Sequence, residues 1–387
     1  MEECLISKFE TIIRDKSILD STSKLEHLHT FKSVPASMAC TSQDSSKDVI
    51  MNQSWDICKN TGMIQLRELF PLDVVYEFPH NDGVGNVWKN HDVELSNFIE
   101  EMSPKTAFEI GSGSGRLGKL YLSKNINNSW TALEPNHVYD EVIMPNFIHL
   151  REWFDSKYNI DKPYDAVIHS HVLEHSYDPI SFLKTIYDQI DNDTLHIFSI
   201  PNLFHFVENR FTNGLNFEHT IFLTEELVDI ILGSIGFEIL KKHYHNELPC
   251  IFYATKKSEP RETTYPHFIY QKNKKVFLDY VDGQLDDVKK LNSEISKFDG
   301  EIFLFGGHIW SQFLISNGLD MSKIKCILDN SPMKQGKRLY GTSLKVKSPK
   351  ILKGRENVAV IVKAAQYSKE IKDDIYNNIN NKVIFWD

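Results

Sequence analysis

The sequence is poor in cysteine, and its five cysteines are widely spaced over 387 residues: Cys4, Cys40, Cys58, Cys250 and Cys326. Closely spaced cysteine pairs mark disulfide frameworks and zinc sites, and the chain has none. We therefore expect free thiols in a reducing compartment, the cytoplasm, and no metal site.

Long apolar runs are also missing. No stretch reaches the roughly 20 apolar residues that cross a bilayer, and the first residues lack the pattern of a secretory leader. Acidic residues outnumber basic ones by 53 to 43, which gives a net charge of −10. We therefore expect no membrane segment and no nucleic-acid partner. The 41% of apolar residues supply core for two or three domains, in a monomer or a dimer.

Changes in pattern divide the chain into four segments: 1–85, 86–256, 257–298 and 299–387. The first is mixed, with a small β-rich element around the turn signal Lys59-Asn-Thr-Gly62. The third begins as a charged, proline-containing linker and continues as a connecting helix from about residue 277.

The second and fourth segments alternate strands with helices. In the second, strands are predicted at 106–110, 130–134, 147–150, 164–170, 195–200, 237–240 and 251–255, and helices at 87–102, 116–123, 179–190 and 224–232. In the fourth, strands are predicted at 301–305, 324–329, 358–362 and 382–386. Such alternation predicts an α/β fold with mostly parallel sheets, Rossmann-like in both segments.

A glycine-rich turn follows the first strand of the second segment. Gly111, Gly113 and Gly115 form Gly-x-Gly-x-Gly, whose backbone can approach a ligand closely. A dinucleotide site has Gly-x-Gly-x-x-Gly directly after the strand. Counted from Gly111, that frame fails at Arg116, and counted from Gly113 it starts two residues late. The pattern weakens the dinucleotide interpretation without excluding it.

Two acidic residues favour S-adenosylmethionine as the ligand. Glu109 precedes the turn, and a cationic cofactor without a pyrophosphate tolerates carboxylates around it. Glu134 ends the next strand, roughly 20 residues on, where a ribose hydroxyl is bound in doubly wound sheets. Trp153 and Phe154, after the third strand, are the candidates to flank the adenine.

His171-Val-Leu-Glu174-His175 follows the fourth strand of this segment, at the edge that faces a ligand crevice. These side chains suit cofactor contact or acid–base work. The order His-x-x-Glu-His differs from the zinc-binding helix motif, and no third ligand is evident, so we predict no metal here.

Glu218 and His219 lie in a region expected to cover the reacting centre. Histidine titrates near neutral pH, so His219 with an adjacent carboxylate suits a general base. His171 and His205 compete for that role, and a histidine that merely bridges loops is the alternative.

These residues together resemble the class I S-adenosylmethionine-dependent methyltransferases. Over roughly residues 50–387 the chain more narrowly resembles the three-part C-methyltransferases that act on nucleotide-linked deoxysugars. The resemblance rests on Glu109-Ile-Gly-Ser-Gly-Ser-Gly115, His171-Val-Leu-Glu-His175, Glu218-His219, and the segments beginning at Cys58 and Phe305. It implies an N-terminal zinc domain, a methyltransferase domain and a C-terminal Rossmann-like domain. It also implies a sugar or nucleotide-sugar acceptor, and His219 as the base assisted by Glu218.

The chain departs from that family in two places. Thr61 stands where the family has a second cysteine, so we expect the zinc site to be degenerate. Asn216 stands where the family has a tyrosine, so the acceptor pocket has changed. An O- or N-methyltransferase acting on another polar small molecule, and a non-catalytic binding protein, therefore remain open. Gly306-Gly307 in the last segment is expected to be scaffold rather than a second cofactor site.

Overall fold

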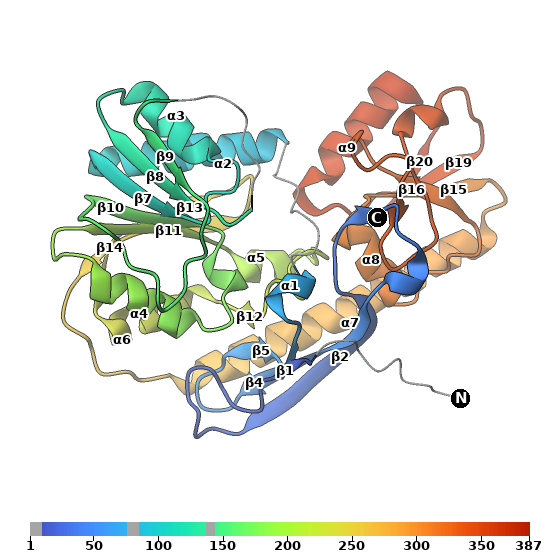
Figure 1. The fold of residues 1–387 in the computed structure, drawn as a ribbon. Coiled ribbons are helices and arrows are strands. Elements are labelled where there is room, and N and C mark those ends of the chain that lie inside the picture. The colour runs from blue at the N-terminus through green and yellow to red at the C-terminus, as the bar shows by residue number, and fades with distance from the viewer. Residues whose placement is uncertain (1–9, 76–84, 137–143) are drawn as a thin grey trace.

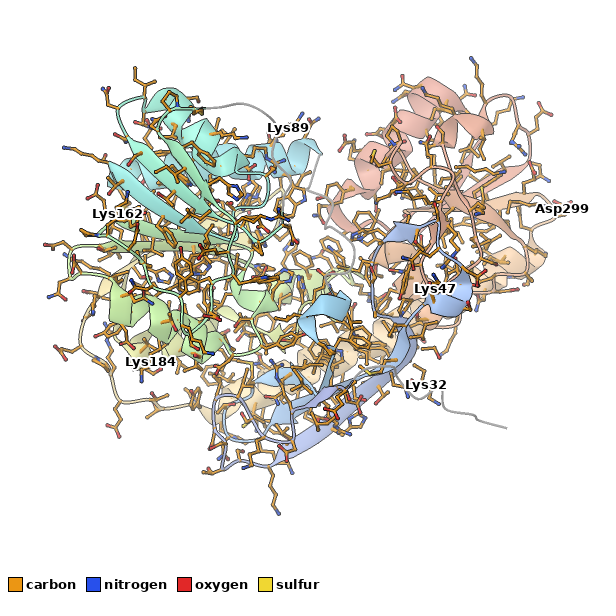
Figure 2. All side chains as sticks on the ribbon, in the orientation of Figure 1. Lys32, Lys47, Lys89, Lys162, Lys184 and Asp299 are labelled. Carbon is orange, nitrogen blue, oxygen red and sulfur yellow. The ribbon has the colours of Figure 1, made fainter. Side chains whose placement is uncertain are left out.

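The computed structural model describes residues 10–75, 85–136 and 144–387. Three parts follow one another along the chain, and one long helix runs along the first and reaches the last (Figure 1). In Figure 2 the labelled Lys32, Lys162, Lys184 and Asp299 lie at the periphery, while side chains fill the space between sheets and helices. Within the described ranges, no helix has both the length and the apolar character that a membrane span requires.

The N-terminal part is built on a four-stranded sheet. Its order is β12-β5-β4-β2, with β2 Leu25–Pro35, β4 Ile50–Cys58, β5 Ile64–Leu66 and β12 Ile221–Phe222. Shorter elements flank it: β1 Ile12–Ile13, β3 Cys40–Thr41, β6 Glu68–Leu69 and α1 Leu72–Val75. The strand β12 comes from the segment that follows His219, so this sheet is completed by residues far along the chain.

The middle part is a seven-stranded sheet of order β13-β14-β11-β10-β7-β8-β9. Its strands are β7 Thr106–Ile110, β8 Ser129–Leu133, β9 Phe147–Leu150, β10 Ala166–Ser170, β11 Leu195–Pro201, β13 Phe237–His245 and β14 Cys250–Lys257. The first five are parallel, and β14 is antiparallel to both of its neighbours. The predicted Rossmann-like α/β sheet is confirmed, and the strand order reverses between β7 and β10.

Helices cover both faces of this sheet (Figure 1). The helices are α2 Asn86–Met102, α3 Arg116–Lys124, α4 Pro179–Gln189, α5 Leu203–Glu208 and α6 Glu225–Ile235. Apolar residues of α2 and α3 share one core with one face of the sheet, and those of α4 and α6 share another with the opposite face. Alternation along β7 separates the two cores: Ala107 lies in the first and Phe108 in the second.

The connecting helix begins earlier than the sequence indicates. Helix α7 spans His267–Lys297, ten residues longer at its start than expected, so the linker is short. Contacts with the N-terminal part stabilise these extra turns, whose sequence has no clear apolar periodicity. Ile269 is 2% exposed, and the buried Asn273 donates to the carbonyl of Gly62 at 2.9 Å. Farther along, Phe277 packs on Trp55 of the N-terminal sheet.

The C-terminal part is a second, parallel α/β sheet of order β18-β16-β15-β19-β20, as predicted. Its elements are β15 Glu301–Phe305, α8 Ile309–Ser316, β16 Ile324–Leu328, β17 Arg338–Leu339, β18 Val346–Lys347, β19 Val358–Ile361, α9 Ser368–Asp374 and β20 Ile384–Trp386. Strand β17 pairs with β3, and a buried ion pair between Arg338 and Asp48 lies beside it. The first and last parts of the chain are therefore joined directly.

Candidate active site

The predicted glycine-rich turn lies at the carboxyl end of β7, beside the reversal of strand order. Gly111, Gly113 and Gly115 all have positive φ, at +69°, +52° and +69°. Glycine adopts this conformation without the strain that a Cβ brings. At Gly111 a Cβ would also lie 2.6 Å from Cγ2 of Val172. The turn therefore needs these glycines, and it leads into α3, which starts at Arg116.

Glu134 lies at the end of β8 and faces the turn. Its carboxylate accepts hydrogen bonds from the backbone N–H of Gly113 at 3.0 Å and of Asn136 at 2.9 Å. The N–H of Gly111 donates to the carbonyl of Leu133 at 2.8 Å. The turn and the acidic residue predicted from the sequence are thus adjacent, at the edge where doubly wound sheets bind nucleosides.

Glu109 is buried within the sheet–helix layer. It lies on the same face of β7 as Ala107, is 3% exposed, and accepts a hydrogen bond from the indole N–H of Trp130 at 2.8 Å. Burial raises the pKa of Glu109 to about 8. Its carboxyl group holds Trp130, which in turn fills the space beside Gly118 on α3. The structure thus gives Glu109 a supporting role, and cofactor contact stays a prediction.

The two predicted adenine neighbours differ in environment. Trp153 is 54% exposed. Phe154 packs edge-on against Phe182 of α4, with ring centroids 5.4 Å apart, and lies 5.5 Å from the ring of Tyr158. Phe154 therefore contributes to the core below the sheet edge, and Trp153 is the ring left exposed to a ligand.

His171 follows β10 in a strained conformation. Its φ is +53°, in the left-handed region that non-glycine residues rarely adopt, and such strain collects at functional sites. Its backbone N–H donates to Ser199, and its Nδ1 lies 3.1 Å from Oε1 of Glu174. The side chain is thereby fixed at the sheet edge, as the sequence predicted.

Glu174 is the centre of a histidine cluster. It is fully buried in the short 3-10 turn Leu173–His175. Burial raises its pKa, but the hydrogen bond with His171 and the proximity of His175 and His219 outweigh burial, so the net pKa lies below the usual value. Ligand atoms of Glu174, His175 and His219 lie within 4.8 Å of one another, close enough for a metal ion.

His219 is oriented by a carbonyl group rather than by Glu218. Its Nδ1 lies 3.2 Å from the carbonyl oxygen of Gly214, and its ring contacts that of His175 edge-on at 4.9 Å. Glu218 is 5% exposed, and its Oε2 lies 4.0 Å from Nδ1 of His175. Burial lowers the pKa of His219 and raises that of Glu218 to about 8.

Asn216 is committed to the backbone of its own loop. Its Oδ1 accepts hydrogen bonds from the N–H groups of Glu218 and His219, both at 2.8 Å, and its Nδ2 donates to Asn213. The side chain therefore shapes the turn that presents His219. The position that resembles the family's tyrosine thus holds a structural residue.

His205 lies outside the cluster. It sits on α5, where its ring packs beside Phe211 at 5.8 Å. The structure therefore brings together His171, Glu174, His175, Glu218 and His219, and leaves His205 apart from them.

Arg14 is a supporting residue that the sequence did not indicate. It is 8% exposed and donates to the backbone carbonyls of Thr220 at 2.9 Å and Tyr177 at 2.5 Å. Burial lowers its pKa to about 10. Thr220 lies one residue after His219, and Tyr177 lies two residues after His175. Arg14 of the N-terminal part therefore holds both of the loops that carry these histidines. A lone arginine in an irregular segment carries no signal of this role.

The two remaining sequence features are occupied by the protein's own groups. In the C-terminal turn, Asp329 accepts from the N–H of Gly307 at 2.9 Å, and the Cys40 thiol donates to the Gly307 carbonyl. These internal hydrogen bonds support the interpretation of the Gly306-Gly307 turn as scaffold.

At Cys58, burial raises the thiol pKa, but hydrogen bonds with Ser17, Ser23 and Thr61 outweigh burial and lower the pKa overall. Hydroxyl groups thus surround Cys58.

No family model matches the chain, and no curated protein matches it. Solved structures do. One is the Burkholderia thailandensis 1,6-didemethyltoxoflavin N1-methyltransferase with bound S-adenosylhomocysteine, at 14% identity and TM-score 0.37, covering 45% of this chain and 82% of that one. The human N-acetylserotonin methyltransferase in complex with S-adenosylmethionine matches at 15% identity and TM-score 0.36. This match covers 45% of this chain and 53% of that one.

A third similar structure is the mitomycin 7-O-methyltransferase, at 16% identity and TM-score 0.36, covering 44% of this chain and 54% of that one. The first of these proteins is named as an N1-methyltransferase and the third as a 7-O-methyltransferase. Identities this low indicate no acceptor, so the function of this chain has to be inferred from its own side chains.

Proposed function

We propose that this protein is an S-adenosylmethionine-dependent methyltransferase that acts on a small polar molecule, a sugar or nucleotide sugar. One arrangement carries the proposal: the glycine turn at Gly111–Gly115 with Glu134 hydrogen-bonded to it, packed against Val172 in the segment that also carries Glu174 and its histidine cluster. A nucleoside site and a proton acceptor then meet at one sheet edge.

The cofactor is held by backbone and carboxylate groups. The positive-φ glycines have no side chains, so a ligand can approach the backbone of the turn closely, and Glu134 is placed to accept from ribose hydroxyls. Trp153 offers an exposed ring to the adenine, and His171 borders the crevice. When bound, the cofactor supplies an electrophilic methyl group on a cationic sulfur.

His219 serves as the general base. A carbonyl oxygen only accepts, so Nδ1 of His219 carries the proton that is donated to Gly214, and Nε2 keeps its lone pair. Because burial lowers its pKa, the ring is neutral at physiological pH and can take a proton from the acceptor. Glu174 then stabilises the imidazolium, and His171 and His175 are the other neighbours of Glu174.

The site of methylation distinguishes two versions of this function. Carbon methylation beside a carbonyl requires a donor for the developing enolate oxygen. The side-chain amide of Asn216 donates one of its two N–H groups to Asn213, which leaves at most one N–H group for an enolate oxygen. Methylation of a hydroxyl oxygen needs no such donor and is the second candidate. N-methylation and a non-catalytic role remain alternatives to be tested.

Titration calorimetry tests the cofactor. We expect the purified chain to bind S-adenosylmethionine, and Glu134→Ala to weaken binding about 10- to 150-fold, as expected for loss of a charged hydrogen bond of roughly 1.5–3 kcal/mol. Glu152→Ala removes an exposed carboxylate from a nearby loop and serves as the matched control. Tight binding of a nicotinamide dinucleotide without binding of S-adenosylmethionine would refute the proposal.

Turnover with labelled cofactor and a panel of sugar and nucleotide-sugar acceptors tests the base. His219→Gln should lower turnover by about 10²–10⁴ and leave cofactor affinity unchanged. His205→Gln, outside the cluster, should retain turnover. If His219→Gln keeps turnover, the base lies elsewhere. Solvent deuterium exchange into an acceptor C–H, dependent on His219, would select carbon methylation over oxygen methylation.

A further inference from the structure

Three side chains from distant parts of the chain converge at the end of β10. His91 comes from α2, His171 from the end of β10 and Cys250 from the start of β14. One ligand atom of each lies within 4.8 Å of the others. His91 and Cys250 are each 1% exposed. The group therefore lies in the interior, and Glu174 connects it to the His219 loop.

Both histidines have one ring nitrogen engaged by a carboxylate. Nδ1 of His91 lies 3.2 Å from Asp92, and Nδ1 of His171 lies 3.1 Å from Glu174. Asp92 also forms an ion pair with Arg116. Since an ionised carboxylate only accepts hydrogen bonds, each Nδ1 carries the proton and each Nε2 presents a lone pair.

Neither Nε2 has a hydrogen-bond partner. Both atoms are shielded from solvent, and buried polar atoms are usually satisfied. The neighbouring His245 shows the usual situation. Its Nε2 lies 3.0 Å from Glu94, and its Nδ1 lies 2.9 Å from the carbonyl of Leu248. A buried histidine ring in this region can therefore have partners for both of its nitrogens, and the unpartnered Nε2 atoms of His91 and His171 are an exception.

We propose that His91, His171 and Cys250 bind a divalent metal ion of the zinc class through the two Nε2 atoms and the thiolate sulfur. Mixed imidazole and thiolate ligands suit zinc, and three protein ligands leave one coordination position open. Ligating histidines generally donate their other N–H to a carboxylate or carbonyl, as both do here. Metal binding displaces the thiol proton to solvent.

The geometry requires only a small contraction. Zinc bonds of about 2.0–2.1 Å to nitrogen and 2.3 Å to sulfur place tetrahedral ligands roughly 3.5 Å apart. The present separations of up to 4.8 Å thus close by about 1 Å. The other candidate group, Glu174, His175 and His219, is a weaker site because neither of its histidines has a ring nitrogen that is both shielded from solvent and unpartnered. The metal would instead fix His171 and, through Glu174, steady that base.

This inference departs from the sequence expectation of no metal. It does not depend on methyl transfer, so cofactor titration of the metal-free chain separates the two proposals.

Cobalt titration of the full-length, metal-depleted chain tests the site. We expect one equivalent of Co²⁺ to bind, with a thiolate-to-cobalt charge-transfer absorption that Zn²⁺ abolishes. Cys250→Ser should remove that absorption, whereas Cys326→Ser, which alters a buried thiol in β16, should retain it. His91→Gln should weaken binding at least tenfold.

A second variant guards against a folding defect in the first. Asp92→Asn keeps all three ligands and should weaken metal binding about 10- to 100-fold, the usual effect of losing a carboxylate partner. The proposal is overturned if the wild-type chain shows no thiolate absorption, or if the absorption survives Cys250→Ser and disappears in Cys58→Ser. Loss of S-adenosylmethionine affinity in His91→Gln without any metal binding would assign the group to the cofactor pocket instead.

Discussion

Substitution of Gly111 by alanine tests how the glycine turn is constrained. The backbone has a φ of +69°, which costs an L-residue about 1–2 kcal/mol. The new Cβ would also lie 2.6 Å from Cγ2 of Val172. A β-branched side chain has little freedom to move away, and such overpacking costs about 1–3 kcal/mol. We therefore expect Gly111→Ala to lower the free energy of unfolding by about 2–5 kcal/mol.

Two companion variants separate the contributions to this cost. Gly354 has a φ of +74°, and no atom lies within 4 Å of the place that a Cβ would take, so Gly354→Ala reports the backbone cost alone, about 1–2 kcal/mol. Adding Val172→Ala to Gly111→Ala should recover the steric part, seen as favourable coupling in a double-mutant cycle.

Urea denaturation measures the stabilities, and calorimetry measures cofactor affinity, which should fall in Gly111→Ala. The reasoning fails if Gly111→Ala is no more destabilising than Gly354→Ala, or if Val172→Ala recovers nothing.

Two further predictions concern buried charge. Asp48→Asn breaks the ion pair with Arg338, whose side chains are 3% and 6% exposed, and should cost about 3–5 kcal/mol in thermal unfolding, whereas Asp279→Asn in an exposed pair should change little. His196 is buried, and burial lowers its pKa to about 3. In the unfolded chain this histidine binds a proton near pH 6.5, whereas in the folded chain it stays neutral until about pH 3. The free energy of unfolding should therefore fall as the pH drops below 6.5 toward 3, by up to about 1.4 kcal/mol per pH unit. His196→Gln should flatten this slope and exposed His267→Gln should not; an unchanged slope in His196→Gln would contradict the cause.

The parts of the fold that the sequence predicted are those governed by local pattern. The alternation of apolar strands and helices around Gly111–Gly115 needs no long-range information, because each strand is apolar over its own length and each glycine marks a turn. The predicted start of α7 was wrong because local pattern was the only guide there too. Ile269 and Asn273 lie in a charged stretch, and their burial comes from the N-terminal sheet packed against them.

The candidate site was predictable where its residues are adjacent in sequence. His171, Glu174 and His175 stand together, and so do Glu218 and His219, so their spacing alone indicated chemistry. His91 and Cys250 had no such signal, because each is a single residue brought to His171 only by helix α2 and the antiparallel strand β14. Adjacency in sequence did not indicate the contact that orients His219, because the carbonyl of Gly214 lies against its ring, and the assisting role of Glu218 stays a prediction.

The loop that carries His219 depends on two parts of the molecule at once. It leaves the middle sheet after α5 and ends in β12, whose register with β5 pairs Ile221 with Gln65 of the N-terminal sheet. Arg14 fastens the same stretch through the carbonyl of Thr220. A base must be held within a fraction of an ångström of its proton, and a long loop cannot supply that precision alone. The N-terminal part therefore acts as the support of the proposed base, a role that needs no zinc ion.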